Sequence, residues 1–388
     1  MKSVLLRGPV LTQSGYGVHC RQICRWLLNL EKAGKIKLTC QVLPWGDTPW
    51  IIDSQRHDGL IGEVMKHSTP LTPKYDATFQ LQLPSEWDSS LGNYNVGISA
   101  VVETDKCNPK WVEDCNKMNK VVVPSEFTKK VLTNSGVLLT EVKVIPESYP
   151  DCYRDSKTVD LNLNLQTKFN FLIVGQLTGN NPENDRKNIF YTIKWLCEAF
   201  KDDKDVGIII KTNGGRNTRI DRRSITGVFT QLLAEVRPSG NPKVTLVHGE
   251  LSEIEVYSLM KEPSVKALVS LTRGEGFGLP LLEAAAAGLP VIATNWSAHT
   301  EFLKLGRYIE IEHKLVDVHK SRIDNNIFVQ GCKWAMPIEE QFKRKAKKFK
   351  ESSSVPTEWA LDLQTKILEK YSQENIASLY DAEFGSLL

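Results

Sequence analysis

The chain has 388 residues, of which 41% are hydrophobic and 24% are charged, and its formal net charge is +3 at pH 7. This length allows two domains of ordinary size, and the near-neutral charge gives no support for bulk binding to nucleic acid. The apolar runs are too short for a membrane-spanning helix, and Met1–Arg7 meets a charge too soon for a signal-peptide core. Because the eight cysteines are scattered and form no C-x-x-C pair, we expect reduced thiols in a cytoplasmic protein.

Strand-like and helix-like segments alternate through the first half of the chain, which predicts an α/β architecture. A loop with two glycines, Thr12–Gly17, leads from the first strand into a helix over Tyr16–Leu30. Another helix starts within Pro124–Phe127, with Ser125 as its cap. The predicted strands of this half are Ser3–Arg7, Leu38–Leu43, Ala77–Gln82, Val96–Val102, Val121–Val123 and Val142–Pro146.

The polar, irregular stretch Glu147–Lys168 is interpreted as a linker, and a second α/β series follows it. Its predicted strands are Phe169–Gly175, Val206–Lys211, Lys243–His248, Ala267–Leu271 and Val291–Thr294. The predicted helices of this part cover residues 188–200, 222–236, 252–261, 281–287, 338–349 and 358–371. We therefore expect two doubly wound, Rossmann-like domains, 1–150 and 151–350, and C-terminal helices, 351–388, that pack back on the first domain.

The richest motif is the turn between the strand Ala267–Leu271 and the helix after it. Two carboxylates, Glu275 and Glu283, frame this turn, and three glycines permit a tight backbone path within it: Gly274, Gly276 and Gly278. Backbone N–H groups at a helix N-terminus bind phosphate, and carboxylates accept hydrogen bonds from hydroxyls. Since open α/β sheets bind ligands at the carboxyl ends of their strands, the turn predicts a nucleotide-sugar site.

From Glu275 to Ala293 the chain follows the pattern E-G-F-G-L-P-x-x-E-A-x-A-x-G-x-P-V-I-A, and in this it resembles the retaining glycosyltransferases of family 4. Three shorter segments are similar to other parts of that family: Ser14–Gly17, Pro124–Phe127 and Val144–Pro146. The resemblance implies the GT-B fold, with two Rossmann-like domains. It also implies transfer of a sugar from a nucleotide diphosphate donor to an acceptor hydroxyl, with retention at the anomeric carbon.

The resemblance assigns roles to the residues of the turn. Glu283 would bind the ribose hydroxyls, and Glu275 would hold hydroxyls of the donor sugar. The remaining donor-binding positions of this segment would face the sugar and the diphosphate: Gly276, Phe277, Gly278 and Leu279.

Further donor-site residues come from other segments. Lys187 is the cation expected at the diphosphate. Because Gln176 stands where many family members have an arginine, either Arg186 supplies the second charge or the diphosphate is bound more weakly. Gly15 and Gly17 would line the donor site from the first domain. Glu103 lies where many members have a histidine, so it is a candidate for contact with the reacting sugar or the acceptor; a carboxylate that caps the next helix is the alternative.

The implied donor is a UDP- or GDP-sugar, with no other cofactor, and the implied acceptor is a hydroxyl of a glycan, a lipid-linked molecule or a protein. We expect no metal, because Asp203–Asp205 matches a D-x-D motif but precedes its strand and is interpreted as a turn. No carboxylate nucleophile is identifiable, which favours front-side attack in which the departing diphosphate takes the acceptor's proton. Two other functions stay open: an epimerase or phosphorylase on a related fold, and a non-catalytic module that binds sugar nucleotides.

The segment Lys343–Lys350 is a dense basic helix. A solvated helix face is the favoured interpretation. The alternative is contact with an anionic membrane surface or an anionic acceptor.

Overall fold

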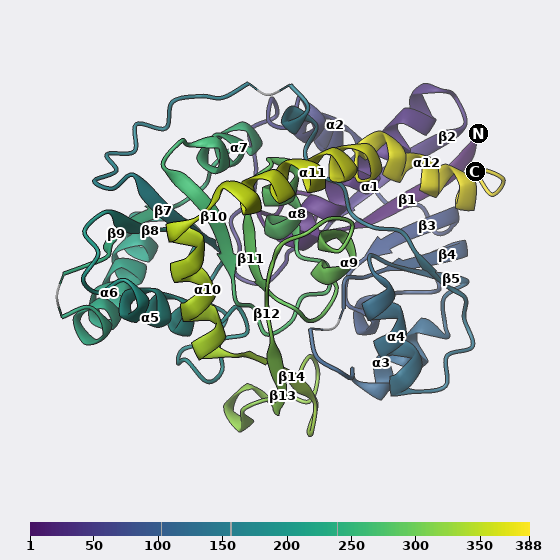
Figure 1. Cartoon of the computed structure of the whole chain (residues 1–388). Coiled ribbons are helices and arrows are strands. Elements are labelled where there is room, and N and C mark those ends of the chain that lie inside the picture. The colour runs from purple at the N-terminus through teal and green to yellow at the C-terminus, as the bar shows by residue number, and fades with distance from the viewer. Residues whose placement is uncertain (102, 156, 239) are drawn as a thin grey trace.

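The first half of the chain forms a six-stranded parallel sheet, seen in a computed structural model that describes residues 1–101, 103–155, 157–238 and 240–388 (Figure 1). The strand order is β2-β1-β3-β4-β5-β6. Its strands are β1 (Lys2–Gly8), β2 (Ile36–Val42), β3 (Tyr75–Leu81), β4 (Gly92–Ile98), β5 (Lys120–Val123) and β6 (Val142–Val144). The helices between them are α1 (Gly15–Lys32), α2 (Leu60–His67), α3 (Pro109–Cys115) and α4 (Glu126–Ser135), with short 3-10 turns η1 (Pro84–Glu86) and η2 (Asp151–Tyr153).

A second six-stranded parallel sheet follows, with the order β12-β11-β10-β7-β8-β9. Read from the other edge, this is the order of a dinucleotide-binding Rossmann fold. Its strands are β7 (Phe169–Val174), β8 (Val206–Thr212), β9 (Lys243–His248), β10 (Val265–Ser270), β11 (Val291–Thr294) and β12 (Ile309–Ile311). Its helices are α5 (Ile189–Ala199), α6 (Arg219–Val236), α7 (Glu253–Lys261), α8 (Leu279–Ala286) and α9 (His299–Leu303).

The end of the chain links the two halves. An antiparallel hairpin of β13 (His313–Asp317) and β14 (Lys333–Pro337), with the turn η3 (Lys320–Arg322), precedes α10 (Glu339–Glu351). Helix α11 (Ser354–Lys370) then packs on α8, and α12 (Gln373–Phe384) joins the core of the first sheet (Figure 1). The two termini lie close together, since the Lys2 ammonium donates to the carbonyl of Leu387.

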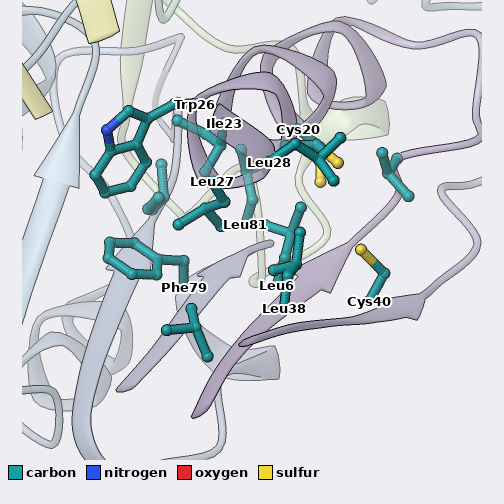
Figure 2. Close-up of a cluster of buried hydrophobic side chains, with 14 of the residues drawn as sticks. Leu6, Cys20, Ile23, Trp26, Leu27, Leu28, Leu38, Cys40, Phe79 and Leu81 are labelled. Carbon is teal, nitrogen blue, oxygen red and sulfur yellow. The ribbon is translucent and has the colours of Figure 1, made fainter. Parts of the chain in front are cut away.

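The core of the first half lies between α1 and the sheet. Figure 2 shows Leu27 of α1 above Leu6 of β1, and Trp26 beside Phe79 of β3. The rings of Trp26 and Phe79 meet edge to face at 5.2 Å, and the Trp26 indole donates to Asp381 of α12 at 2.8 Å. Burial of these large side chains is the main stabilising contribution, so α12 is tied into this core by both packing and a hydrogen bond.

The predicted fold class is confirmed, and the strands lie within a few residues of their predicted limits. The strand predicted over Val96–Val102 is β4, which ends at Ile98; Val102 itself lies outside the described residues. Sequence reasoning missed β12 and the β13–β14 hairpin, because these strands are short and their apolar periodicity is weak. It also missed the 12-residue helix α12, whose apolar side chains join a core built with α1. The domain limits 1–150, 151–350 and 351–388 stay predictions.

None of the helices in the described ranges is both long enough and apolar enough to cross a bilayer. The same described residues contain no group of three or more His, Cys, Asp or Glu side chains arranged to bind a metal ion.

Candidate active site

The glycine turn lies at the carboxyl end of β10 and opens α8. Gly278 precedes the helix with a φ of 104°, a conformation that side chains other than glycine rarely adopt. Pro280 occupies the first turn of α8, where its missing N–H costs nothing, and Gly288 ends the helix with a φ of 71°. Local sequence therefore fixes the path of this loop.

Four charged side chains meet beside the turn. The Lys187 ammonium donates to both carboxylate oxygens of Glu275, at 2.6 and 2.8 Å. One guanidinium nitrogen of Arg186 lies 3.3 Å from Glu275, and another lies 2.9 Å from the carboxylate of Glu103. Because Glu103 belongs to the first half and the other three to the second, this charge cluster spans both halves of the molecule.

The cluster keeps Glu275 ionised although its side chain is only 6% exposed. Burial alone would raise the pKa of Glu275, but the charges of Lys187 and Arg186 and the hydrogen bond from Lys187 outweigh it and lower that pKa to about 2. Burial lowers the pKa of Lys187 despite the attraction of Glu275. In Arg186, the two carboxylates outweigh burial and raise the pKa. The cluster thus carries balanced charge at neutral pH.

The glycine turn is in close contact with the first half of the chain. A Cβ at Gly276 would lie 1.9 Å from the carbonyl oxygen of Ala100, and a Cβ at Gly274 would lie 2.0 Å from that of Glu103. The Gly276 carbonyl accepts hydrogen bonds from the hydroxyls of Ser125 and Thr128, at 2.9 and 3.3 Å. Here glycine is required for the approach of the two halves rather than for a positive φ.

Gly276→Ala is therefore expected to prevent this approach and to lower the rate of any reaction at the site by about a hundredfold or more. The measurement is a steady-state rate on the donor identified below, together with a thermal melt. Gly227→Ala on α6 is the matched control, since no atom lies within 4 Å of a Cβ there and alanine favours a helix. Equal rates for the two variants would contradict the role of Gly276.

A cavity of about 240 Å³ lies between the two halves next to this cluster. From the second half, its walls include Gly175, Lys211 and Glu283. The stem of Lys187 lies 3.9 Å from the position of a Cβ at Gly175, so the charge cluster and the cavity have Gly175 as a common neighbour.

Two titratable groups of the cavity have shifted pKa values. Burial and the charge of Glu253 raise the pKa of Glu283 to about 8. Burial lowers the pKa of Lys211 to about 8, and its ammonium donates to the Asn213 side chain and the Gly249 carbonyl at 2.7 Å each. Such shifts in a concave site are typical of functional groups.

The first half covers this cavity with the segment between β2 and α2, residues 43–59, which we call the strap. Arg56 of the strap pairs with Glu250 at 2.7 Å, and His57 pairs with Glu253 at 2.9 Å. Arg56, His57 and Ile51 all line the cavity. A molecule in the cavity would therefore contact both halves.

The predicted site residues fall into two groups in the structure. Glu103, Arg186, Lys187 and Glu275 come together in the charge cluster, while Glu283 lines the cavity. The other predicted positions have local neighbours. A Cβ at Gly15 would lie 4.0 Å from Leu279, and Cβ atoms at Gly17 and Gly276 would meet the backbone of Thr12 and Ala100. Phe277 packs on Phe302 at a ring distance of 5.4 Å. Because the Phe277 side chain is in the core, only its backbone could face a ligand.

Sequence reasoning missed several charged residues of the cavity: Arg56, His57, Lys211, Glu250 and Glu253. Lys211 and Glu250 stand at the carboxyl ends of β8 and β9, so the rule that drew attention to the glycine turn applied to them as well. The strap carried no such signal, because its position over the cavity depends on how the two halves meet.

Two further segments have local structural roles. Asp203 of the D-x-D match pairs with Lys350 at 3.0 Å. Several basic side chains of Lys343–Lys350 are also engaged, since Lys343 pairs with Glu198 and Lys345 donates to the Glu310 carbonyl at 2.6 Å.

Comparison with known proteins gives matches to one family model and to several solved structures. Residues 228–317 match the sequence model of the family described as glycosyl transferases group 1. The chain has no match among the curated proteins.

Several solved structures share the fold. HepE from Anabaena, solved with UDP and glucose, is 12% identical with a TM-score of 0.62, and the match covers 100% of both chains. A trehalose-6-phosphate synthase studied for glycosyl transfer with retention is 10% identical with a TM-score of 0.62, again over 100% of both chains. At these identities the likeness establishes the fold, which is GT-B.

Other matches are longer proteins. Pneumococcal O-GlcNAc transferase GtfA, solved with UDP and GlcNAc, is 13% identical with a TM-score of 0.52 over 85% of this chain. The present chain spans 60% of that protein and 54% of TarM from S. aureus.

Proposed function

We propose that this protein is a retaining glycosyltransferase that moves a sugar, most simply a hexose, from a UDP- or GDP-sugar to an acceptor hydroxyl. The observation that supports this is that the charge cluster and the cavity lined by Glu283 both lie where the two halves meet, with Gly175 as their common neighbour. A nucleoside in the cavity would place its diphosphate beside Lys187. This arrangement matches the order of groups in a nucleotide sugar.

The proposed donor contacts follow from hydrogen-bonding chemistry. Glu283 would accept from the ribose hydroxyls, and Glu275 would accept from hydroxyls of the sugar. Lys187 and Arg186 would turn from Glu275 towards the diphosphate, whose charge needs cations in a buried site. The backbone N–H groups of Phe277 and Gly278 have no hydrogen-bond acceptor within the described part of the chain and could serve the phosphates.

Front-side attack is the proposed route to retention. The acceptor oxygen would form its bond to the anomeric carbon on the face from which the diphosphate leaves, and the leaving phosphate oxygen would take the hydroxyl proton. Glu103 would contact the sugar or the acceptor, and its ion pair with Arg186 supports this role. A covalent sugar trapped on any carboxylate of a Glu275→Gln variant would instead demonstrate double displacement.

A thermal-shift panel of UDP, GDP, ADP and their sugars tests donor binding, because a ligand that binds only the folded chain raises its melting temperature. We expect one nucleotide series to stabilise the protein and Glu283→Ala to abolish the shift. Product analysis with the donor so identified should then give free nucleoside diphosphate and an extended acceptor. An isomerised donor, a phosphate-dependent reaction, or binding without turnover would each contradict the proposal.

The affinity for nucleoside diphosphate is expected to depend on Glu283 and pH. Because the pKa of Glu283 is raised to about 8, its carboxyl holds a proton at pH 7 and loses it as the pH rises to 9. The ionised carboxylate is the stronger acceptor for ribose hydroxyls, so it should strengthen binding across this range. Titration calorimetry at pH 7, 8 and 9 measures the effect.

The control for this prediction is Glu283→Gln. Lys211 loses its charge in the same pH range and acts in the opposite direction, so the difference between the two proteins isolates Glu283. Identical pH dependence in the wild type and the variant would contradict a ribose contact by Glu283.

A further inference from the structure

Helix α6 (Arg219–Val236) presents an unusually open face. Of its 18 residues, Phe229 alone is buried. The side chains that pack partly on the sheet are Ile225, Leu232, Leu233 and Val236. The opposite side of the helix has no covering element among the described residues.

The first turns of α6 carry three exposed arginines and an exposed apolar residue. Arg219, Arg222 and Arg223 are exposed, and no carboxylate of the described chain lies within ion-pair distance of them. Ile220 is 80% exposed, and at 100° per residue it lies on the same outward side as Arg219 and Arg223, whereas Arg222 lies on the flank towards Phe229. We call these four exposed residues the α6 face.

The nearby acidic residue Asp221 does not neutralise the α6 face. Its carboxylate accepts hydrogen bonds from the Thr218 hydroxyl at 2.7 Å and from the backbone N–H groups of Thr218 and Arg216, at 2.8 and 3.1 Å. It therefore caps the start of α6, and the three arginine charges remain available.

The basic helix α10 differs from α6 in its apolar residues. Lys343 and Lys350 are paired with carboxylates, while Arg344, Lys347 and Lys348 are exposed and have no carboxylate partner among the described residues. Helix α10 therefore carries as many unpaired exposed cations as α6, but it has no large exposed apolar side chain comparable to Ile220.

The start of α6 lies near the mouth of the nucleotide cavity. Asn217, just before the helix, donates to Gln13 at 3.0 Å, and Gln13 lines the cavity. Arg216 pairs with Asp47 of the strap at 3.2 Å.

We propose that the α6 face docks on an anionic lipid bilayer and thereby brings the site to a membrane surface. Guanidinium groups bind lipid phosphates through paired hydrogen bonds, and each basic residue near an anionic surface adds attraction. The exposed Ile220 among the arginines suits insertion at the boundary between headgroups and acyl chains. A symmetric contact between two copies through this face would oppose arginine with arginine, which disfavours self-association.

Vesicle sedimentation with the full chain tests the proposal. Vesicles of phosphatidylcholine alone are compared with vesicles that also contain phosphatidylglycerol. We expect binding only to the anionic vesicles and weaker binding as salt is raised. A variant with Arg219→Gln, Arg222→Gln and Arg223→Gln should bind at least about tenfold more weakly, and Ile220→Ser should weaken binding less.

The matched control removes the same number of exposed charges from α10, through Arg344→Gln, Lys347→Gln and Lys348→Gln. This control should bind vesicles like the wild type. Equal loss in both triple variants, equal binding to neutral vesicles, or concentration-dependent self-association lost only in the α6 variant would each overturn the proposal. Nucleotide thermal shifts in the same variants report folding and donor binding separately, so failure here is distinguishable from failure of the proposed transferase activity.

Discussion

Replacing Lys187 with alanine is expected to reduce sugar transfer about a thousandfold at saturating donor. Lys187 binds Glu275 at 2.6 Å, and its stem lies 3.9 Å from the position of a Cβ at Gly175, a residue that lines the cavity. When the bond to the sugar breaks, negative charge grows on the leaving diphosphate in a site that excludes water, so a fixed cation there lowers the barrier. Single-turnover rates on the identified donor measure this effect apart from product release.

Lys194→Ala on α5 is the control, because this partly exposed lysine makes a long ion pair of 3.8 Å with Glu198 and lies 6.0 Å from the ring centre of Tyr191, both on the surface. It should leave both turnover and stability unchanged. A Lys187→Ala variant that kept its rate while only its KM for the donor rose would contradict a role in the transition state. Such a result would mean that Lys187 binds the donor equally well in the ground state and in the transition state.

Glu275→Gln is expected to lower the free energy of unfolding by about 3 kcal/mol at pH 7. The carboxylate compensates two buried cations, Lys187 and Arg186, and glutamine cannot. The pKa of Glu275 is about 2 in the folded protein, and a glutamate without these interactions, as in the unfolded chain, has a pKa of 4.5. The contribution of the Glu275 carboxylate to the free energy of unfolding is therefore fully present above pH 4.5. It is lost as the pH falls from 4.5 towards 2.

Chemical denaturation at pH 7 and again near pH 3 measures this dependence. The difference in the free energy of unfolding between the wild type and Glu275→Gln should be smaller at the lower pH. Glu235 is an exposed carboxylate on α6, so Glu235→Gln should match the wild type at both pH values. A gap that is the same at both pH values would show that shape, rather than charge, makes Glu275 important.

Much of the fold could be predicted because its signals are local. The strand Val291–Thr294 was predicted at its observed limits, and Ser125 caps α4 as expected by accepting from the Thr128 N–H. A buried parallel strand needs a short apolar run, and a helix start needs a capping side chain, so neither depends on distant residues. The C-terminal helix α12 was missed, because its place in the core depends on α1, far away in the sequence.

The candidate site likewise has one part that the local sequence predicts and another that depends on the tertiary structure. The glycine turn with Glu275 and Glu283 is continuous in sequence, so spacing and turn chemistry point to it directly. The ion pair between Glu103 and Arg186 joins residues that are distant in the chain, and it exists only because the two halves meet.

The sequence by itself determined two Rossmann-like sheets, the path of the glycine turn and the residue types that could hold a phosphorylated sugar. Hydrophobic periodicity, glycine conformation and helix capping act over a few residues and can be read along the chain. Only the tertiary structure decided which charges compensate one another and that the strap with Arg56 and His57 covers the cavity. It also decided that Arg219, Arg222 and Arg223 of α6 have no carboxylate partner among the described residues. Electrostatic and packing contacts between elements depend on distances in space, which local sequence does not specify.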